Sequence, residues 1–212
     1  MALAFNRVAG RRNERAKLVP SVSACNSIQQ KNRDPMAHEM VTVCLRPDAH
    51  HDLHAAIETA MAPFDMNGDH QPYQGEWDQW WLGRPGEEFD VLPGHEGDPR
   101  LVRAPLDSHG DPRHWALGQC DGGPRSLLDF NGMRTRAAQL AAALDHYRAS
   151  QTPYRKRQPE WAIPTEHLLT LDGAWTYVTC TPGSGSSHLD FANAYLDGLA
   201  PDIVVVRLRI HC

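Results

Sequence analysis

Two histidines and a glutamate are spaced so that they share one face of a predicted helix. His50, His54 and Glu58 follow one another at intervals of four residues in a segment with a helical apolar pattern. A histidine pair at this spacing can chelate one divalent metal, such as zinc or manganese, and a helix N-terminus favours the neutral imidazole that binds metal. Further ligands would come from His95 and His109, in a histidine-rich stretch downstream. These residues make a metal-dependent hydrolase one candidate function.

The same spacing is also typical of a solvated helix face, which is the interpretation that we favour. The segment lacks an H-E-x-x-H motif, and no spacing identifies a third ligand. Histidine is abundant, with twelve in the chain, so its enrichment alone is compositional. No spacing defines a nucleophile, a general base or paired catalytic acids. We therefore expect no cofactor for the favoured function, name no catalytic residue, and expect a divalent metal only for the hydrolase alternative.

A glycine- and serine-rich junction could bind an anion. Residues 181–187 read TPGSGSS and precede a predicted helix, so free backbone N–H groups and the helix N-terminus would attract negative charge. The candidate anion-binding residues lie at this junction and along one face of the last predicted strand: Gly183, Gly185, Ser186, Ser187, Arg207, Arg209 and His211. The junction lacks the lysine of a P-loop. A flexible connector beside an exposed, charged strand face explains the same residues, and we favour that interpretation.

Three of the six tryptophans lie in one short segment, residues 77–81, which reads WDQWW. Read with a strand's period of two, Trp80 and Leu82 face one side of a sheet, and Trp77 and Trp81 face the other. Large aromatic surface on both faces suits a central strand better than an edge strand, where exposed indoles invite association. We therefore predict a central strand whose indoles belong to the core, with a stacking platform for bases or sugars as the alternative.

Four short motifs follow one another along the chain: Trp77-Asp78-Gln79-Trp80-Trp81, Asp129-Phe130-Asn131-Gly132-Met133, Leu171-Asp172-Gly173-Ala174-Trp175 and Ile210-His211-Cys212. From about Met36 onward the chain resembles an uncharacterised protein family of actinobacteria and their phages. Members of that family carry a WDWW-like strand, a DFxGM helix start, an LDGxW hairpin and a short last strand with a terminal histidine. Leu82-Gly83-Arg84-Pro85 departs from the family's GGRW-like turn, and Arg209-Ile210-His211 departs from its Asp-x-His. The resemblance implies an order of elements and no established activity.

Composition limits the class of protein. The chain has 212 residues, of which 41% are apolar and 22% charged, as in ordinary soluble globular proteins. No apolar run approaches the roughly 20 residues of a membrane span, and the N-terminus lacks the apolar block of a signal peptide. We therefore expect a cytoplasmic protein without a membrane partner. Five scattered cysteines without a C-x-x-C pair argue against a disulfide framework.

Residues 1–35 differ from the rest of the chain in charge. They carry seven Lys and Arg against two acidic residues, a balance of +5, which leaves −10 for the remainder of a chain whose net charge is −5. They show no sustained apolar period, so we predict a disordered basic tail before a single domain over residues 36–212. An acidic body is not a dedicated nucleic-acid-binding domain, so nucleic acid is expected as a partner only through the tail.

The candidate residues have to be positioned by a predicted α+β domain. Apolar periodicity, capping residues and turn signals predict the following order: a strand over Met40–Arg46, a helix capped by Asp48, the tryptophan strand, a helix begun by Asp129 or Asn131, a hairpin around Asp172-Gly173, a helix after Ser187 and a strand over Ile203–His211. Residues 84–125 are predicted as a long loop-rich insertion, with short extended pieces near Glu88–Leu92 and Leu101–Ala104. This order predicts a ferredoxin-like antiparallel sheet with helices on one face.

Two classes of function fit these predictions. The first is a non-enzymatic binding or accessory protein that engages a protein or an anionic ligand through the open sheet face or the long loop. The second is the metal-dependent hydrolase with its histidine cluster. We favour the first, because no set of residues in the sequence defines a reaction.

Overall fold

The computed structural model describes residues 38–68, 75–83, 86–106, 110–148, 163, 165–177 and 184–211, and for residues 140–148 and 184–186 it describes the backbone alone. All described residues belong to one compact unit, Arg33–Cys212. The predicted basic tail, residues 1–35, lies outside the described residues. Among the described helices, none is long and apolar enough to cross a membrane.

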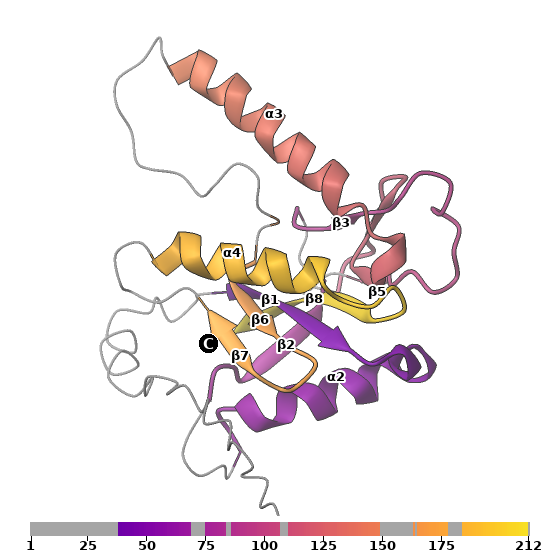
Figure 1. The fold of residues 1–212 in the computed structure, drawn as a ribbon. Coiled ribbons are helices and arrows are strands. Elements are labelled where there is room, and N and C mark those ends of the chain that lie inside the picture. Colours follow the sequence, from indigo (N-terminus) through magenta and orange to yellow (C-terminus); the bar gives the residue numbers. More distant parts are fainter. Residues whose placement is uncertain are drawn as a thin grey trace, which may run out of the picture. The chain divides into compact units, whose positions relative to one another are not determined.

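A mixed α+β architecture is present, and its main sheet is mostly antiparallel (Figure 1). The strands follow the order β2-β8-β1-β6-β7, and β5 pairs with β8 outside this path. They are β1 (His38–Leu45), β2 (Gln79–Leu82), β5 (Gly122–Pro124), β6 (His167–Leu169), β7 (Trp175–Tyr177) and β8 (Val204–His211). A second, two-stranded sheet joins β3 (Phe89–Asp90) to β4 (Gln119–Cys120). The predicted hairpin is confirmed as β6 and β7.

The helices are α2 (Leu53–Met61), α3 (Phe130–Arg148) and α4 (Ser184–Asp197), with short 3-10 turns η2 (Pro47–His51), η3 (Ala62–Phe64) and η4 (Arg125–Leu127). The long middle helix is confirmed, and Asp129 rather than Asn131 caps it, since its Oδ1 accepts a hydrogen bond from the backbone N–H of Gly132 at 2.8 Å. All three helices were predicted because their apolar periodicity is local in the sequence.

The central strands are covered on both faces by different helices. On β8, alternate residues from Val204 to Ile210 join a core cluster that contains Ile57 and Met61 of α2. Val205 joins the other core cluster, with residues of α3 and α4. Figure 1 shows α2 and α4 on opposite sides of the sheet. The prediction of helices on one face is therefore wrong, because β1 buries Thr42 and Cys44 as well as the opposite row, and both rows need cover.

The central pairing also differs from the predicted antiparallel sheet. β1 pairs with β6 in parallel, while every other strand pairing among the described residues is antiparallel. A parallel neighbour requires a long crossover connection, and here the chain between β1 and β6 includes α2, the insertion and α3. A ferredoxin-like arrangement is not confirmed.

The insertion is tied to the sheet by buried charges. The Asp121 side chain is 1% exposed and accepts two hydrogen bonds of 2.7 Å from Nη1 of Arg113. It also accepts one of 2.9 Å from the backbone N–H of Ala104, while Arg113 pairs with Glu88 at 3.0 Å. The two predicted extended pieces are present, as β3 and as a bridge between Val102 and Gly122. The strand β5, which joins this segment to the main sheet, was not predicted.

The start of α2 allows a direct test of the predicted cap. Asp48 lies in η2, which has no side-chain cap, whereas Asp52 caps α2 by accepting a hydrogen bond from the Ala55 N–H at 3.1 Å. We expect Asp52→Ala to lower the free energy of unfolding by about 1 kcal/mol. Asp48→Ala is expected to cost less than about 0.5 kcal/mol. Urea denaturation of both variants measures the difference, and equal losses would refute the assignment of Asp52 as the cap.

Candidate functional site

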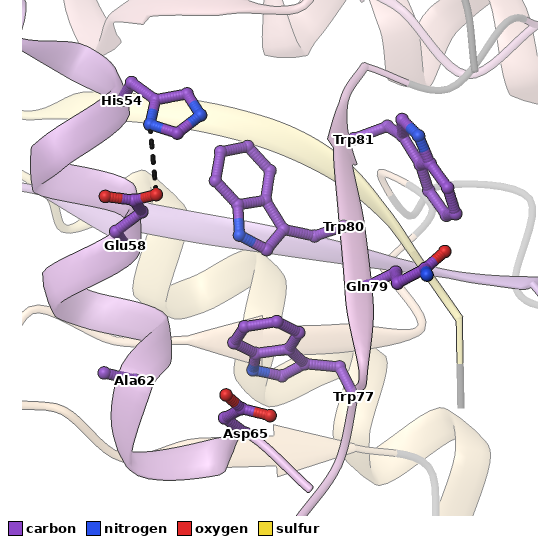
Figure 2. Close-up of a pocket in the computed structure, with 8 residues that line it drawn as sticks. All are labelled: His54, Glu58, Ala62, Asp65, Trp77, Gln79, Trp80 and Trp81. Atoms are coloured by element: carbon purple, nitrogen blue, oxygen red, sulfur yellow. Dashed lines mark ion pairs between the residues drawn. The ribbon is translucent and has the colours of Figure 1, made fainter. Parts of the chain in front are cut away.

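The strand with the tryptophans lies at the edge of the sheet. β2 pairs with β8 alone among the described strands, and Trp80 and Trp81 are half-buried. The prediction of a central strand is therefore wrong. Apolar side chains on both faces of a strand can be partly covered at an edge when a helix borders one face, and α2 borders one face of β2 here (Figure 2).

A cleft of about 610 Å³ lies between α2 and β2. Its lining residues come from the two elements and from the segments that flank them: His54, Glu58, Ala62, Asp65, Trp77, Gln79, Trp80 and Trp81. From α2 and its end come residues four apart, His54, Glu58 and Ala62, which form one stripe along the helix. Figure 2 shows the indoles of Trp77 and Trp80 pointing from the strand side towards this stripe.

Trp77 and Trp80 lie on the same side of the strand, although their spacing predicts opposite sides. The chain bends at Asp78, and regular strand geometry begins only at Gln79. Trp77 instead forms a separate bridge with Asp65. The bend breaks the period of two, so two indoles face α2, and Trp81 points to the other side of β2 (Figure 2).

The indole of Trp77 is held in place by hydrogen bonds around it. Its Nε1–H donates to the carbonyl oxygen of Met61 at 3.1 Å. The backbone carbonyl oxygen of Trp77 accepts a hydrogen bond from the backbone N–H of Met66 at 2.7 Å. A ring fixed in this way loses little conformational entropy when a ligand stacks on it, so one wall of the cleft is preorganised.

Trp80 faces a pair of side chains that can move. The ring of His54 lies 5.0 Å from the Trp80 ring, at 42° to it. His54 Nδ1 lies 3.4 Å from Glu58 Oε1, and the two side chains are 71% and 61% exposed. Such an exposed pair contributes little to stability. His54 and Glu58 can therefore rearrange around a ligand at low cost.

The charge of the cleft is negative. Glu58 and Asp65 supply carboxylates, and among the lining residues that the structure describes there is no lysine or arginine. Asp65 Oδ1 accepts a hydrogen bond from the Asn67 N–H at 2.8 Å, which fixes the orientation of that carboxylate. Sequence reasoning missed Asp65. The stripe of residues four apart on α2 was the available signal for the helix wall, but the loop that brings Asp65 beside Trp77 has no such pattern.

The predicted anion-binding residues are divided by the structure. Arg209 and His211 lie near Trp81, where the Arg209 guanidinium is 5.6 Å from the Trp81 ring and His211 Nδ1 is 2.7 Å from Asp78 Oδ1. Ser187 is exposed in the first turns of α4, which also contain Gly185 and Ser186. Gly183 lies outside the described residues. The anion site stays a prediction.

Arg207 is not part of an exposed row. It is 1% exposed, its guanidinium lies 4.1 Å from the Phe89 ring, and its Nη1 donates to the carbonyl oxygens of Glu87 and Glu88. Burial lowers its pKa to about 10. The expectation of an exposed charged face is wrong for Arg207, because the insertion covers this part of β8.

The predicted metal ligands point in different directions. His50 contacts the carbonyl oxygen of Pro47 and lies against His51, with ring centroids 4.0 Å apart and the rings tilted by 41°, whereas His54 faces Trp80. His95 is exposed in a turn of the insertion. His109 lies outside the described residues. Within the part of the chain that the structure describes, no group of three or more His, Cys, Asp or Glu side chains is placed to hold a metal ion. The metal hypothesis stays a prediction.

His188, near the start of α4, provides a pH-dependent prediction. It is 8% exposed, and its Nε2 has no hydrogen-bond partner within the described residues. Burial lowers its pKa from 6.5. Below about pH 6.5 the unfolded chain therefore binds a proton that the folded chain does not, so stability is present above this pH and falls as the pH decreases. We expect the Tm to decrease from about pH 7 to about pH 5.5, and His188→Gln to reduce this decrease.

The exposed His51 supplies the control for that measurement. His51→Gln is expected to leave the pH dependence of the Tm as in the unmodified chain, because the His51 side chain is exposed and the fold does not bury it. Thermal unfolding followed by circular dichroism across the pH range tests both variants. An unchanged pH dependence in His188→Gln would contradict the assignment.

The fold and the cleft together define a mixed α+β protein with an aromatic, acidic cleft at one sheet edge. No family model, curated protein or solved structure matches the chain. The function is therefore argued from the cleft itself.

Proposed function

We propose that this chain is a cytoplasmic, non-enzymatic binding or accessory protein whose ligand binds in the cleft between α2 and β2. The observation that carries the proposal is the pair of half-buried indoles, Trp77 and Trp80, on one wall of that cleft. Covering an aromatic side chain removes a large apolar surface from water, which is favourable in free energy. An apolar hollow with a polar rim on a protein surface is typical of a ligand site.

The geometry favours binding over reaction. One indole is locked by the Met61 carbonyl oxygen, which prepares a flat surface for stacking. The opposite wall carries the exposed His54–Glu58 pair, which has room to adapt to a ligand. Among the described residues that line the cleft, no serine, threonine or cysteine is present to act as a nucleophile beside a hydrogen-bonded base. These features support recognition of a ligand.

The predicted anionic ligand does not suit this cleft. Glu58 and Asp65 would repel an anion, and the part of the cleft lining that the structure describes contains no lysine or arginine. An anion is better suited to the other side of β2, near Arg209 and His211. A protein partner stays compatible with the cleft, because a side chain of the partner could enter it.

Nuclear magnetic resonance of the indole N–H groups tests the proposal. The protein is titrated with three classes of compound: an organic ammonium salt, a neutral oligosaccharide and inorganic phosphate. We expect at least one class to shift the Nε1–H signals of Trp77 and Trp80. Trp115 lies outside the cleft, so its signal is the internal control and should not move.

A variant at Trp80 measures how much one indole contributes to the affinity for the ligand. Trp80→Ala removes one stacking surface and is expected to weaken binding of the responding ligand by about tenfold or more, because stacking on an aromatic side chain contributes about 1–3 kcal/mol. If none of the three classes shifts the signals of Trp77 and Trp80 at millimolar concentration, the proposed function is wrong.

A further inference from the structure

Several aromatic rings in the described part of the chain already lie beneath an arginine of the same chain. Four guanidinium groups lie over rings, at 4.0 to 5.6 Å from the centroids: Arg113 over Trp115, Arg125 over Phe130, Arg207 over Phe89 and Arg209 over Trp81. Trp77 and Trp80 differ from these rings. Within the described residues, no lysine or arginine lies over either of them, although both rings pack against a core cluster and the His54 ring lies 5.0 Å from the Trp80 ring. A cation from outside would meet the parts of the two rings that line the cleft.

The carboxylates of the cleft add to this preference. Glu58 and Asp65 line the same hollow as the two indoles, and the described lining residues include His54 but no lysine or arginine. A cation in the hollow is attracted both by the ring quadrupoles and by the carboxylates. A neutral sugar would gain the stacking contact without the attraction between charges, and an anion would be repelled.

The geometry of the carboxylates indicates which cation fits. A guanidinium group binds best when one carboxylate offers it both oxygens. Here Asp65 Oδ1 already accepts a hydrogen bond from the Asn67 N–H, so the carboxylate whose orientation is fixed has one oxygen engaged. The other carboxylate, Glu58, faces His54 Nδ1 in an exposed pair. An alkylated ammonium group needs no paired acceptors, is weakly hydrated and is well suited to an aromatic wall.

We infer that the cleft between α2 and β2 binds an alkylated ammonium group, held against Trp77 and Trp80 and balanced by Glu58 and Asp65. This inference rests on the proposed function and specifies its ligand class. The ammonium group belongs either to a small free compound or to a methylated lysine side chain of a protein, and both carry the same chemistry.

Choline and its neutral carbon analogue, in which a tert-butyl group replaces trimethylammonium, test the role of the charge. The two have nearly the same shape. With the indole signals of Trp77 and Trp80 as the readout, choline is expected to bind about tenfold more tightly than the analogue. Raising the salt concentration should weaken choline binding and leave the analogue unaffected, because salt screens the attraction of exposed charges.

Variants that remove one charge each test how much Glu58 and Asp65 contribute to choline binding. Glu58→Gln and Asp65→Asn keep the size of each side chain, and Asp65→Asn also keeps an oxygen that can accept from Asn67. Each is expected to weaken choline binding several-fold and to leave binding of the neutral analogue unchanged. Asp190→Asn, an exposed carboxylate on α4 outside the cleft, is the matched control and should leave both affinities unchanged.

A second arm distinguishes the two sources of the ammonium group. Trimethyllysine with a blocked amino group and an amidated carboxyl group is titrated in parallel with choline. Tighter binding of the lysine derivative indicates a methylated protein, and tighter binding of choline indicates a small compound; either ranking supports the ammonium class.

Two results would overturn the inference. Equal affinity for choline and its neutral analogue would remove the role of the charge. Signals that respond to the oligosaccharide or to phosphate and not to choline would show another ligand class. In both cases the proposed function stands, since a ligand still binds the cleft; only the absence of any response would also refute the binding function.

Discussion

Replacing Asp121 with alanine is expected to lower the free energy of unfolding by about 3–5 kcal/mol, because it leaves a buried charge without its main partner. The Arg113 side chain is 8% exposed and donates twice to Asp121. After the substitution, Glu88 and the ring of Trp115 are the described groups that remain beside the guanidinium, and Glu88 is the one carboxylate among them. Burial raises the pKa of Asp121, even though Arg113 opposes this shift. The pair is therefore costly to bury and costlier still to break.

Equilibrium denaturation in urea measures this loss, and a surface ion pair supplies the control. Asp98 and Arg100 form a 2.8 Å pair in which the arginine side chain is 50% exposed. Asp98→Ala is expected to cost less than about 1 kcal/mol. If Asp121→Ala costs no more than Asp98→Ala, the buried pair does not hold the insertion to the sheet.

The second large effect is expected at Gly83, directly after β2. Its φ of +77° is a left-handed conformation, and a Cβ built there would lie 2.1 Å from Asp121 Oδ1 and 2.4 Å from Arg113 Nη1. We expect Gly83→Ala to cost about 1–2 kcal/mol for the backbone. Displacement of the buried ion pair adds about 1–3 kcal/mol.

Gly94 separates the two contributions. It has a similar φ of +87°, with no atom within 4 Å of a built Cβ. Gly94→Ala is therefore expected to show the backbone cost alone. Denaturation of the two variants side by side gives the difference, and equal losses would mean that the ion pair adjusts without cost to the added methyl group.

Local patterns were sufficient to predict most elements. The alternation of Val204, Val206, Leu208 and Ile210 predicted β8, and Asp172-Gly173 predicted the turn between β6 and β7, where Gly173 has a φ of +79°. Such signals depend on neighbours in the sequence. The strand order depends on distant residues, so the parallel pairing of β1 with β6 and the edge position of β2 had no local signal.

The candidate site was predictable in part for the same reason. His54 and Glu58 were found because their spacing of four residues places them on one helix face. The orientation of Trp77 was predicted wrongly, because the bend at Asp78 and the bridge to Asp65 are not visible in a period of two. The Asp121–Arg113 pair was missed, since its partners meet only when the insertion packs on the sheet.

The position of β1 also bears on how the protein is made. β1 lies between β8 and β6, and both of these neighbours are synthesised well after it, once α2, the insertion and α3 have been made. Until they emerge, an apolar strand from the beginning of the domain has neither edge paired and must wait, because pairings between distant segments form slowly. Acquisition of the native sheet is thus expected only after β8 has been synthesised, and until then β1 is an unpaired apolar strand open to association with other chains.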